Sequence, residues 1–195
     1  MIRTRLIAIA APLLVLLSAC GINSVPTAEE EAKARWADVQ NDYQRRSDLI
    51  PNLVATVRAA AAQERNVLRE VTEARASASR IQMTGEQLTD PQAMARFAEA
   101  QARLTISLQR LQEAYPELRA NTNYETLMVQ LEGTENRVAR SRERYNQAVQ
   151  SYNTLIRTFP SVIGARVVHG AQPMVPYQAD PESQRAPRAD FGNST

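Results

Sequence analysis

Apolar residues recur every seven positions along most of this chain. One row begins at Trp36 and a second begins three residues later, at Val39. Two interleaved rows at spacings of three and four residues form the buried seam of a left-handed coiled coil. They predict one long helix from Thr27, where Thr27 and Glu30 match a capping box, to about Ile81. The rows are Trp36, Tyr43, Ile50, Val57, Glu64, Val71 and Ala78, and Val39, Arg46, Leu53, Ala60, Val67, Ala74 and Ile81.

A proline interrupts this helix within the stretch YQRRSDLIPNLV, residues 43–54. The seven-residue phase continues across Pro51, which favours one kinked helix over two separate helices. Because Pro51 has no N–H, the carbonyl of Ser47 loses its helical partner. We expect the side chains of Asp48 or Asn52, which flank the bend, to satisfy the freed backbone groups.

A second predicted helix follows a turn at residues 84–92. Asp90 is a favourable N-cap, and Pro91 suits the first helical position. The seven-residue repeat then continues to Tyr115, and Pro116 ends or bends the helix. The repeat comprises Met94, Phe97, Gln101, Leu104, Leu108, Leu111 and Tyr115.

The last predicted helix begins near Thr122, which forms a second capping pattern with Glu125, and stops at Pro160. Residues 166–195 are dense in proline and polar residues, which predicts an extended or disordered tail. The rows of the helix are Tyr124, Leu131, Val138, Tyr145, Tyr152 and Phe159, and Met128, Glu135, Arg142, Val149 and Ile156.

These elements predict an all-α fold, an antiparallel up-and-down bundle of three to four long, coiled-coil-like helices over residues 27–165. A break near Pro51 or a short helix after Pro116 would raise the number of helices from three to four. The composition agrees with this fold, because Gly 6 and an aromatic content of 5% are low for a protein built from sheets.

Four charged residues occupy seam positions: Arg46, Glu64, Glu135 and Arg142. A lone buried charge costs several kcal/mol, so we expect these groups to pair or to lie near a wet edge. The favoured interpretation is that they form interhelix pairs that set the alignment of the helices. The alternative is a polar patch that binds a partner.

The charge balance argues against a nucleic-acid binder, which needs a surplus of basic residues. The net charge is +2, and without Arg3 and Arg5 the 21 remaining basic residues balance 21 acidic ones. One cysteine, Cys20, and one histidine, His169, are too few for an intrachain disulfide, a zinc site or a Ser-His-Asp or Cys-His catalytic set. No cofactor is expected. A hydrolase that uses two carboxylates is the enzyme class left open.

The N-terminus combines the parts of an export signal. A basic start, MIRTR, precedes the 12 apolar residues Leu6–Leu17, a signal-peptide length that falls short of the ~20 residues needed to cross a bilayer. The sequence LSAC, ending at Cys20, resembles the bacterial lipobox, in which the peptide is cut before a cysteine whose thiol carries diacylglycerol. We therefore predict a lipoprotein signal peptide at residues 1–19, lipidation of Cys20, and a tether at residues 20–26.

Two or three acyl chains anchor a protein stably to a membrane. Gly21 follows the cysteine in place of the aspartate that resembles an inner-membrane retention signal. In a Gram-negative cell we therefore expect the outer membrane, with the bundle facing the periplasm. The alternative is an uncleaved N-terminal anchor in the inner membrane, with no role for Cys20.

Two long stretches of the chain resemble the LemA family. The first, YQRRSDLIPNLVATVRAAAAQERNVLREVTEARA, contains the pattern R-R-x-D-L-I-P-N-L-V. The second, YPELRANTNYETLMVQLEGTENRVARSRERYNQAVQSYNTLIRTFPS, contains Y-P-x-L, L-E-G-T-E-N, R-Y-N and F-P in order, and APRADF resembles the family's endings. The resemblance runs from about Asn23 to Phe191. It implies an all-α up-and-down bundle tethered to a bacterial membrane, with no catalytic residues to carry over. Many members have an N-terminal transmembrane anchor, from which the lipobox here departs.

The combined expectation is a membrane-anchored, non-enzymatic scaffold or adaptor for other envelope proteins. The runner-up is a binding module that holds an envelope lipid or a peptidoglycan-derived ligand between helices near Arg46 and Arg142. Self-association is left open, because long seams often leave an apolar stripe uncovered.

Overall fold

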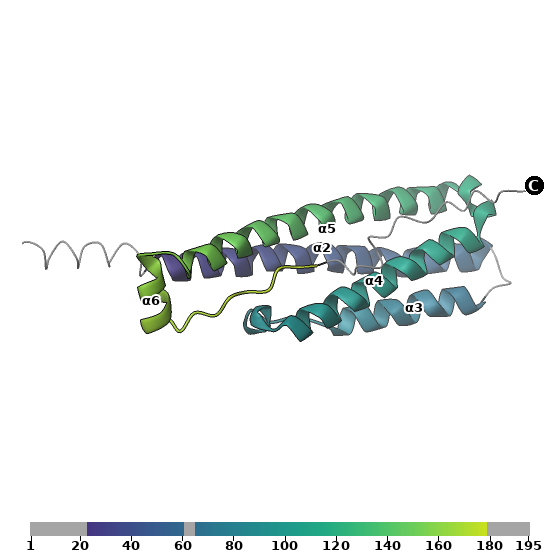
Figure 1. Ribbon diagram of the computed structural model, residues 1–195. Helices are drawn as coiled ribbons and strands as arrows, with labels where there is room; N and C mark the ends of the chain where they lie inside the picture. Colours follow the sequence, from purple (N-terminus) through teal and green to yellow (C-terminus); the bar gives the residue numbers. More distant parts are fainter. Residues whose placement is uncertain (1–22, 61–64, 179–195) are drawn as a thin grey trace, which may run out of the picture.

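Four long helices run alternately up and down in the computed structural model, which describes residues 23–60 and 65–178 (Figure 1). No strand occurs within these two ranges, and the predicted all-α antiparallel bundle is confirmed. The elements are α2 (Ser24–Ala60), α3 (Arg65–Arg80), η1 (Glu86–Thr89), α4 (Pro91–Ala114), η2 (Pro116–Ala120), α5 (Thr122–Leu155) and α6 (Ser161–Val167).

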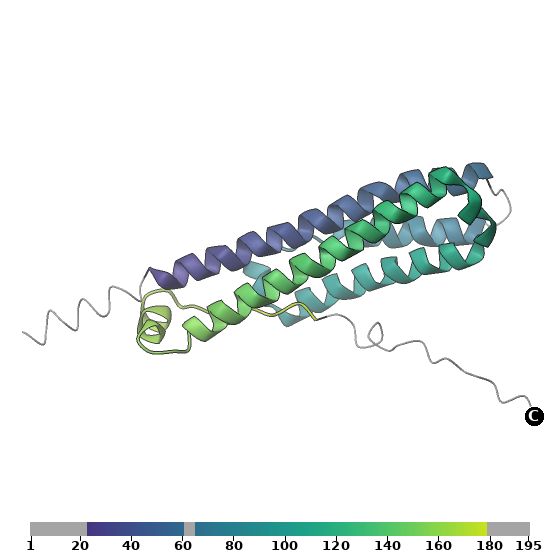
Figure 2. The same cartoon turned by 90° about the horizontal axis from the view of Figure 1, so that it is seen from above.

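The two longest helices, α2 and α5, form the central pair. They have 37 and 34 residues, and at about 1.5 Å per residue each is roughly 50 Å long. They lie antiparallel and side by side in both views (Figures 1 and 2). Their interface is built from apolar residues of the predicted seven-residue rows. The buried row residues are Trp36, Val39, Tyr43, Ile50, Leu53 and Val57 on α2, and Tyr124, Leu131, Val138, Tyr145, Val149 and Tyr152 on α5.

The predicted single helix from Thr27 to about Ile81 is wrong, because the chain reverses direction after Ala60. Helix α3 runs back alongside α2 and pairs with α4 (Figure 1). The repeat suggested one helix because α2 and α3 each carry seven-residue rows. The number of residues between the two helices happens to continue the same seven-residue spacing from one to the other. The buried stripe of α2 nevertheless stops at Val57, and residues 58–60 are exposed. That interruption is the local signal of the turn.

The helix ends match the predicted signals only in part. Helix α4 begins as predicted, with the Asp90 carboxylate as its N-cap. Helix α2 begins at Ser24, so that Thr27 lies inside the first turn and its hydroxyl donates to a backbone carbonyl one turn earlier. Helix α5 is capped by Asn121, one residue before the predicted cap at Thr122. The predicted caps therefore gave the position of each helix start to within a few residues.

Helix α2 continues through Pro51, as the phase of the apolar residues predicted. The carbonyl of Ser47, which Pro51 leaves without its helical partner, accepts a hydrogen bond from Nε of Arg75 in α3 at 2.9 Å. Arg75 therefore fills the role that was expected of Asp48 or Asn52. Pro51 thus leaves the Ser47 carbonyl free to accept a hydrogen bond that links α3 to α2.

The core consists of two apolar clusters, one towards each end of the α2–α5 pair. The α3–α4 hairpin covers the end that contains Pro51 (Figure 1). The other end is covered by η1, by α6 and by an extended segment, residues 171–178, which we call the strap. The strap lies beyond residue 165, the predicted end of the bundle, yet it completes the core.

The strap is extended, as predicted for residues 166–195, but it is packed and bonded to the bundle. The Asn153 side chain of α5 donates to the carbonyl of Met174 at 2.8 Å and accepts from its N–H at 2.9 Å. Asn146, seven residues earlier, makes the same pair of bonds with Tyr177 at 3.0 and 2.8 Å. Met174 and Tyr177 are both buried. The strap is therefore extended, and it forms part of the core.

The predicted signal peptide, residues 1–19, and Cys20 lie outside the residues that the structure describes. None of the helices in the described part is both long enough and apolar enough to cross a membrane. The expectation of a lipid anchor consequently rests on the sequence alone.

Candidate functional site

The Arg46 guanidinium lies inside the bundle, where only 3% of its side chain is exposed. Nη1 donates to the Glu135 carboxylate of α5 at 2.7 Å and to the Thr105 hydroxyl of α4 at 3.0 Å. Nη2 donates to the side-chain oxygen of Gln101 at 3.0 Å and to its carbonyl at 3.3 Å. The planar fork of an arginine can serve acceptors on two helices at once. We call Arg46, Gln101, Thr105 and Glu135 the Arg46 cluster.

Glu135 is shared with a second arginine. Arg142, on the same helix, lies 3.9 Å from the Glu135 carboxylate, and its guanidinium lies 5.1 Å from the centre of the Tyr177 ring. Arg46 lies at the same distance from the ring of Tyr43. The hydroxyls of Tyr43 and Tyr177 are 2.9 Å apart. One carboxylate, two cations and two phenols thus form a connected polar network between α2, α5 and the strap.

Burial raises the pKa of the Tyr43 hydroxyl well above its ordinary value near 10, and the neighbouring Tyr177 hydroxyl raises it further. The pKa values of Tyr145 and Tyr152 are also raised by burial. These phenols therefore keep their protons at neutral pH and serve as hydrogen-bonding groups. The shifts move them away from the range in which general acid–base catalysts work.

A groove of about 790 Å³ between α4 and α5 opens onto the Arg46 cluster. Its walls are apolar, with Leu108 on α4 and Met128 and Val129 on α5. Glu125 and Glu132 add two carboxylates to the Glu135–Arg46 pair that also lines the groove. With three carboxylates and one guanidinium in its lining, the groove is acidic overall.

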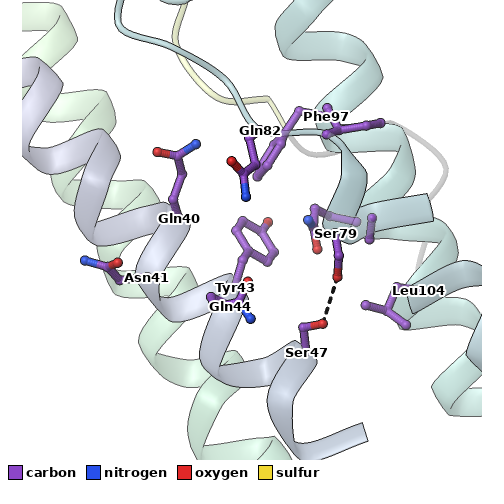
Figure 3. Close-up of a pocket in the computed structure, with 12 residues that line it drawn as sticks. Gln40, Asn41, Tyr43, Gln44, Ser47, Ser79, Gln82, Phe97 and Leu104 are labelled. Atoms are coloured by element: carbon purple, nitrogen blue, oxygen red, sulfur yellow. Dashed lines mark hydrogen bonds between the residues drawn. The ribbon is translucent and has the colours of Figure 1, made fainter. Parts of the chain in front are cut away.

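A smaller pocket of about 270 Å³ lies on the other side of the cluster, between α2, α3 and α4 (Figure 3). Amide side chains such as Gln40 and Gln82 line it together with the rings of Tyr43 and Phe97. Ser47 and Ser79 face each other across it with their hydroxyls 3.0 Å apart (Figure 3). Its lining has no charged side chain. The pocket therefore offers hydrogen bonds to a neutral group and no charge to hold an ion.

The structure brings together three of the four predicted seam charges. Arg46 and Glu135 form an interhelix pair of the expected kind, and Arg142 joins them through Glu135. Glu64, like the predicted lipidation site Cys20, lies outside the described residues.

Sequence reasoning missed Gln101 and Thr105 of the Arg46 cluster, and Tyr177 of the polar network. Gln101 carried a usable signal, because it interrupts the apolar row of the helix that became α4 and has to find a polar partner when buried. Tyr177 carried no such signal, because it lies in a segment without helical periodicity.

No group of three or more His, Cys, Asp or Glu side chains that could hold a metal ion is found in residues 23–60 and 65–178. The Arg46 cluster contains a guanidinium, an amide, a hydroxyl and a carboxylate. These groups can align helices or bind a polar ligand by hydrogen bonds and charge.

Comparison with protein families identifies a relationship that covers most of the chain. A search of curated proteins finds no match to this chain. A scan against protein-family models matches the LemA family over residues 35–191, a range that includes α2 from residue 35 onward, α3 to α6, the Arg46 cluster and the strap. The match covers most of the chain, and this protein belongs to the LemA family.

Proposed function

We propose that this protein is a lipid-anchored scaffold of the bacterial cell envelope, which holds other envelope proteins at the membrane and carries out no catalysis. The observation that carries the proposal is the internal use of Arg46. Nη1 and Nη2 of its guanidinium donate hydrogen bonds to Gln101 and Thr105 of α4 and to Glu135 of α5. A cation committed in this way aligns helices, and a well-aligned rigid bundle is what a scaffold requires.

The proposed anchor is Cys20, the last residue of the lipobox-like LSAC sequence. Cys20 precedes Ser24, the first residue of α2, by only four positions. Gly21 favours the outer membrane of a Gram-negative cell, with the bundle in the periplasm. The alternative location is the inner membrane, through an uncleaved N-terminal anchor.

The second candidate function is a binding module for an envelope lipid or a peptidoglycan-derived ligand. It is favoured by the groove between α4 and α5, whose lining includes Arg46. Nε of Arg46 is buried and has no hydrogen-bond partner among the described residues.

The variant Arg46→Met separates the two functions. If Arg46 aligns the helices, the substitution removes the hydrogen bonds that Arg46 donates to Gln101 and Thr105. The free energy of unfolding should then fall by about 2 kcal/mol. Urea unfolding followed by circular dichroism measures this loss. Arg45→Met is the matched control, because Arg45 is the exposed neighbour of Arg46 and should leave the unfolding curve unchanged.

The ligand-binding function predicts the opposite outcome for Arg46→Met. The unfolding curve would be unchanged, while binding of soluble muropeptides or of phosphatidylglycerol vesicles to the folded protein would be lost. That result would replace the scaffold with the binding module.

A further inference from the structure

Exposed apolar side chains are concentrated at one end of the molecule. Of the six large apolar residues that are exposed in the described part of the chain, four lie between positions 159 and 168. They are Phe159, Ile163, Val167 and Val168. Scattered single apolar residues are normal on a surface, whereas a cluster of this kind marks a contact surface.

Helix α6 presents this cluster on its outer side. Ile163 is 55% exposed and Val167 is 79% exposed, and their spacing of four residues puts them on one face of the helix. Gly164 and Ala165 are buried and let the helix lie close against the bundle. The apolar face of α6 therefore points away from the core, with no partner among the described residues.

Helix α6 lies at the end of the bundle where α2 begins. Figure 1 shows α6 beside the first turns of α2, and Ala165 and Val25 belong to the same buried cluster. Cys20 lies only four positions before Ser24, the first residue of α2. A chain of that length spans at most about 14 Å.

We propose that the outer face of α6, formed by Ile163 and Val167 together with the flanking residues Phe159 and Val168, docks on the surface of the lipid bilayer. The proposal rests on the lipid anchor of the proposed function, because the short tether keeps this end of the bundle within reach of the headgroups. Apolar side chains of an interfacial helix enter the boundary between headgroups and acyl chains by about 5–10 Å.

The charges around α6 fit an anionic bilayer. Arg157 and Arg166 flank the apolar face, and cations near a membrane surface are attracted to anionic headgroups. The acids in the first turns of α2 are engaged elsewhere. Glu29 and Glu30 bond to Lys33, and Glu31 bonds to Arg35.

The test uses the mature chain of the proposed function, residues 20–195, carrying Cys20→Ser, so that neither an acyl chain nor the apolar segment Leu6–Leu17 contributes to binding. Flotation with vesicles of phosphatidylethanolamine and phosphatidylglycerol measures the partition of the protein into the lipid. Adding Ile163→Ser and Val167→Ser should lower the partition coefficient at least about tenfold, because two branched apolar side chains no longer enter the lipid. Both residues are exposed, so the helical melting curve should not change.

Val129→Ser is the matched control. Val129 is 63% exposed, but it lies on α5, away from the α6 end. The proposal predicts that this variant binds the vesicles as the Cys20→Ser chain does. Equal loss in the control and in the double variant would show that the binding is nonspecific and would overturn the proposal.

Two other outcomes would also overturn it. Vesicle binding that is unaffected by Ile163→Ser and Val167→Ser would exclude α6 as the docking face. Concentration-dependent dimers in sedimentation, abolished by the same two substitutions, together with no vesicle binding, would identify a second copy of the chain as the partner. All these measurements use Cys20→Ser, so their results do not depend on whether Cys20 is lipidated.

Discussion

Two buried residues of α2, Tyr43 and Arg46, sit three positions apart and are accommodated in opposite ways. Glu135 and three polar acceptors take the place of water around the Arg46 guanidinium. Tyr43 keeps its proton, because burial beside another phenol disfavours its anion. Tyr43 therefore takes part in the polar network as a neutral hydroxyl at neutral pH.

This difference predicts alkaline sensitivity that can be assigned to Tyr43. In the unfolded chain the hydroxyl loses its proton near pH 10, whereas in the folded chain its pKa is higher. Stability is therefore complete below pH 10 and falls as the pH rises above it. The free energy of unfolding should therefore be lower at pH 11 than at pH 8, with part of the loss coming from Tyr43.

Urea unfolding between pH 8 and 11 compares the wild type with Tyr43→Phe. The variant loses one hydrogen bond at every pH, so only the slope above pH 10 is diagnostic. The difference in unfolding free energy between the two proteins should shrink with rising pH. Parallel curves would show that the buried phenol of Tyr43 does not contribute.

At the scale of residues, the sequence identified the charges but not all of their partners. Arg46 and Glu135 could be found because charge at a seam position demands compensation. Thr105 could not, because a hydroxyl is tolerated on either face of a helix and nothing in its spacing sets it apart. Tyr177 depends on where the strap packs, which no local pattern encodes.

At the scale of elements, the link between α2 and α3 depends on a missing backbone donor. Pro51 leaves the carbonyl of Ser47 free within the helix, and Arg75 of α3 donates to it. Helices tolerate internal proline when another group re-satisfies the freed carbonyl. Pro51, the residue that marks the interruption in the sequence, thus also frees the Ser47 carbonyl through which α3 is hydrogen-bonded to α2.

A double-mutant cycle tests this arrangement. Arg75→Met removes the donor while keeping an apolar stem, and should cost about 1 kcal/mol of unfolding free energy. In a Pro51→Ala background the new N–H can bond to Ser47, so the cost of Arg75→Met should become smaller. A coupling energy close to zero, measured by urea unfolding of the four proteins, would contradict the arrangement.

The helical periodicity predicted the type of each long element better than the connections between them. The start of α4 at Asp90 and Pro91 followed from local chemistry, since a cap and a fixed φ act within one turn. The reversal after Ala60 did not, because a seven-residue phase reports which face is buried and not which way the chain runs. The available hint was that the two rows lose their large apolar residues at Ala60 and Glu64.

At the scale of the whole molecule, the bundle has two unlike ends. One end is closed by the α3–α4 hairpin around Pro51, and the other by α6 and the strap (Figure 1). Helix α2 begins at the second end, where the apolar outer face of α6 is also exposed. The anchor proposed at Cys20 would hold that end at the membrane and leave the α3–α4 hairpin projecting from it.

The central claim is that Cys20 carries the lipid that anchors this bundle. The most direct measurement is the intact mass of the protein extracted from the membranes of its own cells. The claim predicts a chain that begins at Cys20 and carries the added mass of diacylglycerol, with or without a further acyl chain, and a Cys20→Ser variant that keeps residues 1–19 and gains no lipid. A membrane-extracted wild-type chain that retains Met1 and an unmodified Cys20 would contradict it.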